Sequence, residues 1–245
     1  TNSRVGTEDV YGYQAQFYIE NVHFDKKEDI CFSSMRISVP GIIQWGGYSN
    51  FIRPDIHNND SFVDLKNIEP IDIYSNKDYK ISYHLSHNFL FDFMKEENIL
   101  KQTPSFVIES NSKKDLTWFV NKANNMLKLI EIAIGQPLYY DKMSVESPDI
   151  LTDYGNGNKY PQLLEVIHSS KKMTANNHDN KKNFSHDFLF TLKDLEKVDS
   201  FNLEEISTEL DPVIELYIDT IYNKTLSISR HFLNMIQALE TYHSR

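Results

Sequence analysis

An arginine and a histidine held on one face of a helix could act together on a phosphate group, because arginine binds a phosphate and histidine transfers a proton. Arg53 and His57 stand close together, but the intervening Pro54 forbids a regular helix that would present both. Arg230 and His231 are adjacent, so on a helix their side chains point about 100° apart. Neither pair presents both groups to one phosphate, so we assign no catalytic residue and recognise no catalytic motif in this chain, and the sequence leaves open whether the protein is an enzyme.

The carboxyl-terminal segment carries polar residues that could contact a ligand or another domain, namely Arg230, His231, Glu240 and His243. Glu240 lies almost three helical turns after Arg230, so these two side chains cannot pair directly. We expect the four residues to anchor their helix to the preceding domain or to a following helical domain. A functional role at such a domain interface is the alternative.

Nine histidines could supply metal ligands. His84 and His87 fall in a predicted strand and the turn after it, where their odd spacing places them on opposite faces. His178–Asp179 and His186–Asp187 supply other nitrogen and oxygen donors, but the signal is weak. A phosphate-binding glycine loop and a dinucleotide fingerprint are both absent from the sequence. We expect surface histidines, no metal and no cofactor.

Trp45 and Tyr48 flank two glycines that would let a ligand approach the aromatic rings closely. Together with Tyr11 or Tyr13 they could form a platform that stacks on a sugar or a base. We expect Trp45 to be a core residue at the end of a strand, and the stacking platform is the alternative.

The composition is that of a globular chain, with 245 residues of which 40% are apolar and 24% charged. The apolar runs are far shorter than the ~20 residues of a transmembrane helix, and the single cysteine cannot form an internal disulfide. These observations predict a cytoplasmic protein without a membrane partner. The formal net charge of −10 disfavours direct nucleic-acid binding, with a local patch at Lys171–Lys172 and Lys181–Lys182 as the alternative.

Short segments rich in β-branched and aromatic residues, separated by turn residues, fill the chain from Val10 to about Ser110. Lys80–Leu85 alternates between polar and apolar residues, which predicts a strand with one solvent-exposed face. Further strands are expected at Gln14–Ile19, Ile30–Val39, Gly41–Trp45, Ile71–Tyr74, Asn88–Met94 and Ser105–Glu109. Strands at this spacing predict an antiparallel sandwich or a partly closed barrel.

Helical spacing replaces this alternation after Ser112, which we expect to cap a helix that lies on the sheet and ends at Gly135. A strand is expected at Pro137–Tyr140, and helices return from Leu203 onward. The last two helices are joined tightly enough to be antiparallel neighbours. The predicted class is α+β, with an N-terminal antiparallel β-sandwich or barrel-like domain, a covering helix and a C-terminal helical hairpin.

We expect three regions: a β-rich domain with its covering helix at 1–135, a mixed segment with exposed loops at 136–200, and the helical hairpin at 201–245. In the last helix, large apolar residues recur every three or four positions, at Ile228, Phe232, Met235, Ile236, Leu239 and Tyr242. This spacing predicts a core-facing helix. No capping residue follows it, so we expect the natural protein to continue beyond Arg245.

A few segments of the chain are similar to a known family. They are Arg230–Leu233, Gln237–Glu240, Tyr242–His243, Phe106–Ser110 with the helix that follows it, and Leu210–Pro212. The segments resemble the ApeA-type bacterial anti-phage proteins, in which a β-rich N-terminal domain precedes a helical HEPN domain. In outline, the resemblance covers most of the chain.

The resemblance implies the sensing or regulatory N-terminal region of an abortive-infection defence protein. Its HEPN ribonuclease residues would lie outside this chain. The implied partners are the C-terminal HEPN domain or a second copy of the chain, together with a phage-derived trigger. The alternative is a carbohydrate or other small-ligand binding module on the β-sandwich, which would need an exposed Trp45.

Overall fold

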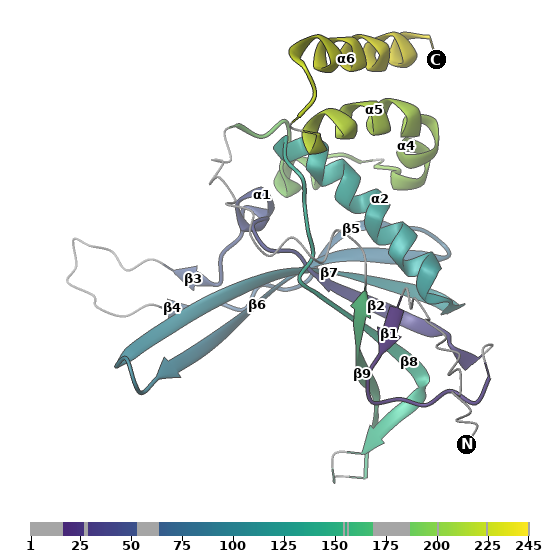
Figure 1. Cartoon of the computed structure of the whole chain (residues 1–245). Coiled ribbons are helices and arrows are strands. Elements are labelled where there is room, and N and C mark those ends of the chain that lie inside the picture. The colour runs from purple at the N-terminus through teal and green to yellow at the C-terminus, as the bar shows by residue number, and fades with distance from the viewer. Residues whose placement is uncertain are drawn as a thin grey trace, which may run out of the picture.

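Figure 1 shows the protein as a computed structural model, which describes residues 17–26, 29–52, 64–153, 155, 157–168, 187–199, 201–223 and 225–244. Within these residues the fold is α+β, with an antiparallel sheet, a long helix across one face of it, and further helices beyond (Figure 1). The predicted fold class is therefore confirmed. Tyr11, Tyr13, Arg53, His57, His178, His186 and both expected lysine pairs lie outside the described residues.

Seven strands of the described chain form one antiparallel sheet in the order β1-β9-β8-β2-β7-β6-β5. Their bounds are β1 (Phe17–Ile19), β2 (Phe32–Ser38), β5 (Ile71–Ser75), β6 (Tyr79–Asp92), β7 (Glu97–Lys114), β8 (Lys142–Asp153) and β9 (Lys159–His168). A separate short pair consists of β3 (Phe51–Ile52) and β4 (Asp64–Leu65). The large sheet stays open rather than closing into a barrel, and β2 is its central strand.

The helices of the described chain lie on one side of this sheet and beyond it (Figure 1). They are α1 (Ile43–Gly46), α2 (Leu116–Ile134), α3 (Leu192–Leu195), α4 (Leu203–Glu209), α5 (Asp211–Tyr222) and α6 (Ile228–His243). Helix α2 is the predicted covering helix. Helices α5 and α6 pack together as the predicted hairpin, with α6 running back over α5 (Figure 1).

Helix α2 has clear physical start and stop signals. The Asp115 side chain accepts a hydrogen bond from the backbone N–H of Trp118 (2.8 Å), so Asp115 and not the expected Ser112 is the N-cap. Ser112 instead lies within β7, which continues to Lys114. Gly135 ends the helix as predicted, because its φ of 67° is a left-handed conformation that favours glycine.

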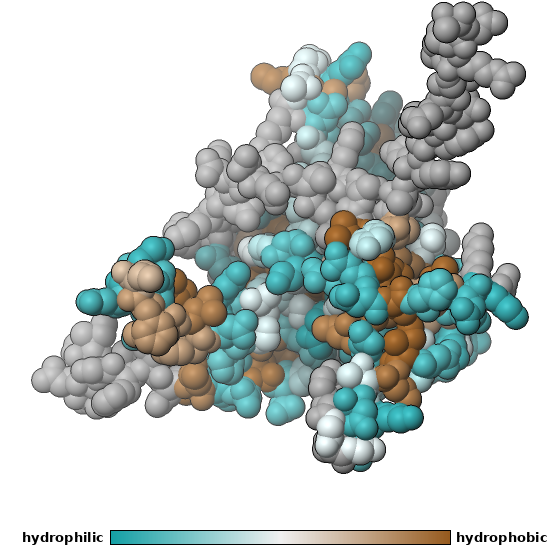
Figure 2. Space-filling view, turned by 60° about the horizontal axis from the view of Figure 1, so that its bottom comes forward, coloured by the Kyte–Doolittle hydropathy of each residue, from teal (hydrophilic) through white to brown (hydrophobic). Residues whose placement is uncertain are grey.

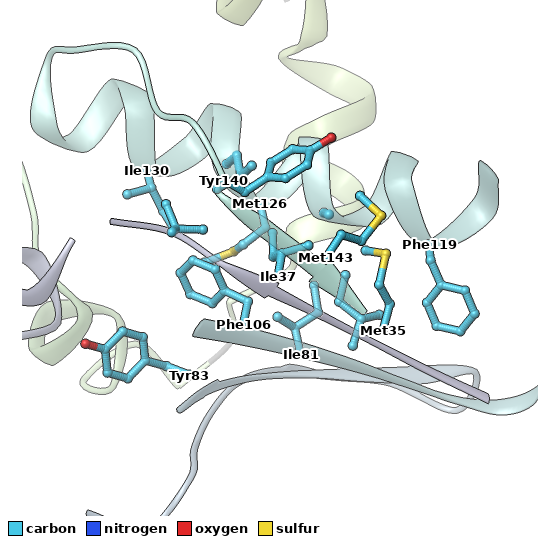
Figure 3. Packing of buried hydrophobic residues seen from close by; sticks show 14 of the residues in the cluster. Met35, Ile37, Ile81, Tyr83, Phe106, Phe119, Met126, Ile130, Tyr140 and Met143 are labelled. Carbon is cyan, nitrogen blue, oxygen red and sulfur yellow. The ribbon is translucent and has the colours of Figure 1, made fainter. Parts of the chain in front are cut away.

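The core lies between α2 and the sheet face that α2 covers (Figure 3). Met35 and Ile37 of β2, Phe106 of β7 and Met143 of β8 are essentially fully buried there. Each such side chain contributes roughly 1.5–3 kcal/mol through burial. Because strand side chains alternate, the residues between them point to the other side of the sheet. We call these two surfaces the covered face and the open face, the latter including Arg36 of β2.

Two local predictions were wrong, for identifiable reasons. Gly41–Trp45 was expected to be a strand, but Ile43–Gly46 forms the helical turn α1, which ends at Gly47 with a φ of 68°. The strand expected at Pro137–Tyr140 is irregular chain, and β8 begins at Lys142. Both runs are short and apolar, and such runs do not distinguish a strand from other buried chain.

Candidate functional site

The predicted polar residues of the last helix all lie on α6. Arg230, Glu240 and His243 are exposed, and His231 is half-buried. Within the described part of the chain, no hydrogen bond or ion pair joins these four side chains to one another. They are therefore separate surface groups and do not form a reactive cluster.

The apolar side of α6 is exposed, so the prediction of a core-facing helix is wrong. Ile228 is 88% exposed, Phe232 62% and Leu239 58%, whereas Ala238 is the residue of α6 that is buried. The reason is that α6 packs chiefly on α5, through the side of the helix that carries Ala238. A run of exposed large apolar side chains is typical of a surface that contacts a partner.

Helix α4 is attached to the sheet domain through Glu204. Its carboxylate accepts hydrogen bonds from Lys122 of α2 and from the hydroxyl of Tyr79 on β6. Burial opposes the charge of Glu204, but these two hydrogen bonds outweigh burial and lower its pKa. Burial and the bond to Glu204 raise the pKa of Tyr79, so the tyrosine remains a donor at neutral pH. The ammonium of Lys122 also lies 5.1 Å from the ring centroid of Tyr79.

Helix α5 is attached to α2 at two further points. Lys128 of α2 pairs with Asp211 (3.2 Å) and Glu215 of α5. The fully buried Glu131 of α2 accepts a hydrogen bond from the hydroxyl of Tyr222, at the end of α5. Burial and this hydrogen bond raise the pKa of Tyr222. Together with Glu204, these contacts link the sheet to the helices that lead to α6.

Trp45 and Tyr48 do not form a ligand platform. The ring of Trp45 is fully buried and packs edge-on against Phe106, with centroids 6.3 Å apart. The space beside Gly46 is filled by the protein itself, since a Cβ there would lie 2.6 Å from the hydroxyl oxygen of Tyr83. The hydroxyl of Tyr48 donates to Glu196 (2.7 Å), and that contact raises the pKa of Tyr48 to about 12. Trp45 is therefore a core residue, as expected, although it lies in the helical turn α1 and not at the end of a strand.

A groove of about 470 Å³ lies over the open face and was not foreseen from the sequence. It is lined by residues of β2, β6, β7, β8 and β9. Arg36 lies in it on the central strand, and its Nη1 donates a hydrogen bond to the Oγ of Ser105 (3.3 Å). The strand register sets four side chains abreast on adjacent strands, in the order Lys142, Ser38, Ser105 and His84.

Figure 2 looks onto the open face and shows hydrophilic residues between two apolar groups. The apolar group on the left lies over the end of the β6–β7 hairpin, which projects from the sheet (Figures 1 and 2). There Phe93 is 81% and Met94 97% exposed, and the ring of Phe91 packs on that of Phe93 with centroids 4.2 Å apart. This end of the hairpin is a second exposed apolar surface, in addition to the apolar side of α6.

The described residues contain no group of three or more histidine, cysteine, aspartate or glutamate side chains that could hold a metal ion. His84 and His87 lie on opposite faces of β6, as their spacing predicted. His84 shares a hydrogen bond with Ser82 (2.9 Å), and His87 packs against Phe51. Across the described ranges, every helix is too short or too polar to traverse a bilayer.

The fold and these surfaces define an α+β sheet domain with a helical extension. The family described as ApeA N-terminal domain 1 matches residues 1–203, which ends where α4 begins. Because this match covers most of the chain, the protein belongs to the ApeA N-terminal domain 1 family, as the resemblance predicted. The family indicates an anti-phage defence protein and implies a C-terminal effector domain. Neither a curated protein nor a solved structure matches the chain.

Proposed function

We propose that this chain is the sensing and regulatory N-terminal region of an abortive-infection protein that responds to a phage-derived trigger in the cytoplasm. Its effector would be a HEPN ribonuclease domain whose catalytic residues lie outside the chain. The observation that carries the proposal is the exposed apolar side of α6, which follows the family-matched region and has no cover within the described residues.

The contacts of α2 support a route from the sheet to that surface. Helix α2 packs on the covered face and also holds α4 and α5 through Lys122, Lys128 and Glu131. A change in the sheet that moves α2 would therefore strain these polar contacts. Because α6 packs on α5, the strain would reach the surface that contacts the effector.

The polar residues of α6 would set the register of that contact. With about 100° per residue, His243 and Glu240 border the exposed apolar side, whereas Arg230 lies roughly opposite to it. His231 lies between the apolar side and the side packed on α5, consistent with its partial burial. His243 and Glu240 are therefore the residues of this set best placed to contact a following HEPN domain.

An RNA-cleavage assay tests the proposal by comparing this chain with the full-length protein. We expect cleavage by the full-length protein in response to phage infection and none by this chain alone; cleavage by this chain would overturn the assignment. In the full-length protein, Phe232→Ser should uncouple cleavage from infection. Gln237→Ala, on the opposite side of α6, is the matched control and should leave it unchanged.

A second copy of the chain is the other partner that the apolar side of α6 could take. Light scattering of the 245-residue chain distinguishes a second copy from the effector domain as the partner. A monomer at high concentration supports the effector as the partner, whereas a dimer that Phe232→Ser dissociates would assign the surface to self-association.

A further inference from the structure

The open-face groove combines an arginine without an acidic partner, an unsatisfied buried hydroxyl and a local excess of positive charge. We propose that this groove binds a small phosphorylated ligand of about mononucleotide size, with Arg36 holding the phosphate. This site is separate from the proposed coupling of α6 to an effector, so each can fail without the other.

Arg36 is placed to hold an anion that the protein does not supply. Among the described residues its guanidinium makes one hydrogen bond, to Ser105, and no ion pair. Two carboxylates of its own face have other partners, since Glu109 pairs with Lys80 (3.2 Å) and Glu146 accepts from Ser34 (3.2 Å). Glu165, which lies in register with Arg36 across β8 and lines the groove, makes no ion pair with it in the described structure. A guanidinium has five N–H donors in a planar fork that matches the oxygens of a phosphate. Most of these donors therefore remain available to a ligand.

Ser38 supplies the second, independent observation. It follows Arg36 by two residues on β2, so both side chains point to the same face. Ser38 is 8% exposed and lines the groove, and its hydroxyl has no hydrogen-bond partner within the described structure. A buried hydroxyl without a hydrogen-bond partner is destabilising, because the water it has lost is not replaced. A phosphate oxygen would accept its hydrogen bond once the side chains that close this hydroxyl off from the groove shift aside.

The charges around the groove favour a single anionic group. Arg36, Lys101 and Lys142 face Asp141 and Glu165, which leaves an excess of one positive charge where the whole chain carries −10. One phosphate ester complements this excess. A polynucleotide would bring many phosphates against the acidic remainder of the surface, which disfavours it.

The size and walls of the groove point to a ligand larger than phosphate alone. A volume of about 470 Å³ falls within the range of roughly 300–1,000 Å³ typical of small-molecule sites. The side chains of Leu90 and Leu163, 52% and 55% exposed, line the groove on β6 and β9. They offer apolar contact to a flat group such as a nucleobase, while Ser86 and Asn88 offer hydrogen bonds.

Isothermal titration calorimetry of the 245-residue chain tests the proposal with three probes: adenosine 5′-monophosphate, inorganic phosphate and adenosine. We expect the monophosphate to bind most tightly, phosphate alone to bind weakly, and adenosine to bind least. Arg36→Gln should weaken the binding of the monophosphate by roughly 10-fold to 100-fold, because it removes a charge-assisted contact. Ser38→Ala should weaken it by about 2-fold to 10-fold.

Two variants guard against misinterpretation. Arg36→Lys keeps the charge but loses the fork, so it should bind with an affinity between the wild type and Arg36→Gln. Lys77→Gln removes an exposed charge in the β5–β6 turn, outside the groove, and should bind like the wild type. Unfolding temperatures without ligand show whether each variant is folded.

Three results would overturn the proposal. The first is no binding of either phosphate-containing probe at millimolar concentration. The second is equal binding by wild type and a folded Arg36→Gln variant, which would place any site elsewhere. The third is Arg36-dependent binding of acetate with none of phosphate, which would assign the groove to carboxylates. None of these results bears on RNA cleavage by the full-length protein.

Discussion

The covered face and the open face of the sheet are built by the same strands yet have opposite chemistry. Along β2, Met35 and Ile37 are buried under α2, while Ser34, Arg36 and Ser38 alternate with them on the open face. Packing constrains the first set, because a cavity or a clash there costs several kcal/mol. The second set contributes little to packing, so its residues can serve a ligand. Substitutions on the two faces should therefore affect stability and recognition separately.

The largest effect is expected on the covered face, from Phe106→Ala. Phe106 is 1% exposed and packs edge-on against both Trp45 and Tyr83, with ring centroids 6.3 and 5.9 Å away. The variant should lower the free energy of unfolding by about 3–5 kcal/mol, measured by urea denaturation. Lys101→Ala, exposed on the same strand, should change it by less than about 0.5 kcal/mol. Equal losses of unfolding free energy in the two variants would show that the two faces do not differ in their contribution to stability.

An intermediate effect is expected where the helices meet, from Tyr222→Phe. The variant removes the hydrogen bond to the buried Glu131 and should lower the free energy of unfolding by about 1–3 kcal/mol. Hydrogen exchange should become faster in α5. Tyr217→Phe is the control, because the Tyr217 hydroxyl has no hydrogen-bond partner in the described structure. A control loss as large as that of Tyr222→Phe would disprove the role of the bond.

A smaller, pH-dependent effect is expected on the open face. Burial, and then the positive charge of Arg36, lower the pKa of His84 below 6.5. The unfolded chain therefore binds more protons than the folded chain as pH falls below 6.5. The stability that neutral His84 contributes should be complete above pH 6.5 and should be lost on acidification through the lowered pKa.

Urea denaturation of wild type and His84→Gln across this pH range measures the effect. The difference in the free energy of unfolding between them should shrink on acidification. When both proteins also carry Arg36→Gln, this difference should change less with pH, because one cause of the lowered pKa of His84 is gone. A difference that is constant with pH would show that His84 does not titrate in this range.

The smallest effect on stability is expected from Phe232→Ser on α6. Phe232 is 62% exposed, so the free energy of unfolding should change by less than about 0.5 kcal/mol, measured by urea denaturation. Ile218→Ala on α5, where the side chain is 8% exposed, should cost about 2–5 kcal/mol and serves as the contrast. A large loss from Phe232→Ser would mean that this side of α6 supports the fold itself.

Most elements of the fold could be predicted because their signals are local. The alternating segment Lys80–Leu85 forms part of β6, as predicted, and the segment with helical spacing before Gly135 forms α2. The class, the covering helix and the closing hairpin follow from such periods. The short runs at Gly41–Trp45 and Pro137–Tyr140 were misassigned, because their conformation depends on what surrounds them.

The groove residues could not be found in this way, although a local signal was present. The alternation in β2 puts Ser34, Arg36 and Ser38 on one polar face, which marks them as candidates. Their partners come from distant parts of the chain, and Ser105 is 69 residues from Arg36. Strand periodicity does not specify which strands become neighbours.

By itself, the sequence determined which side of each strand and helix is apolar, because side-chain direction follows from the backbone period. The tertiary structure decided which of those sides is covered. On the sheet, α2 covers the apolar face and leaves Arg36 on the other. On α6, the apolar side stays exposed, because burial depends on what packs against a helix and its own residues do not provide that partner.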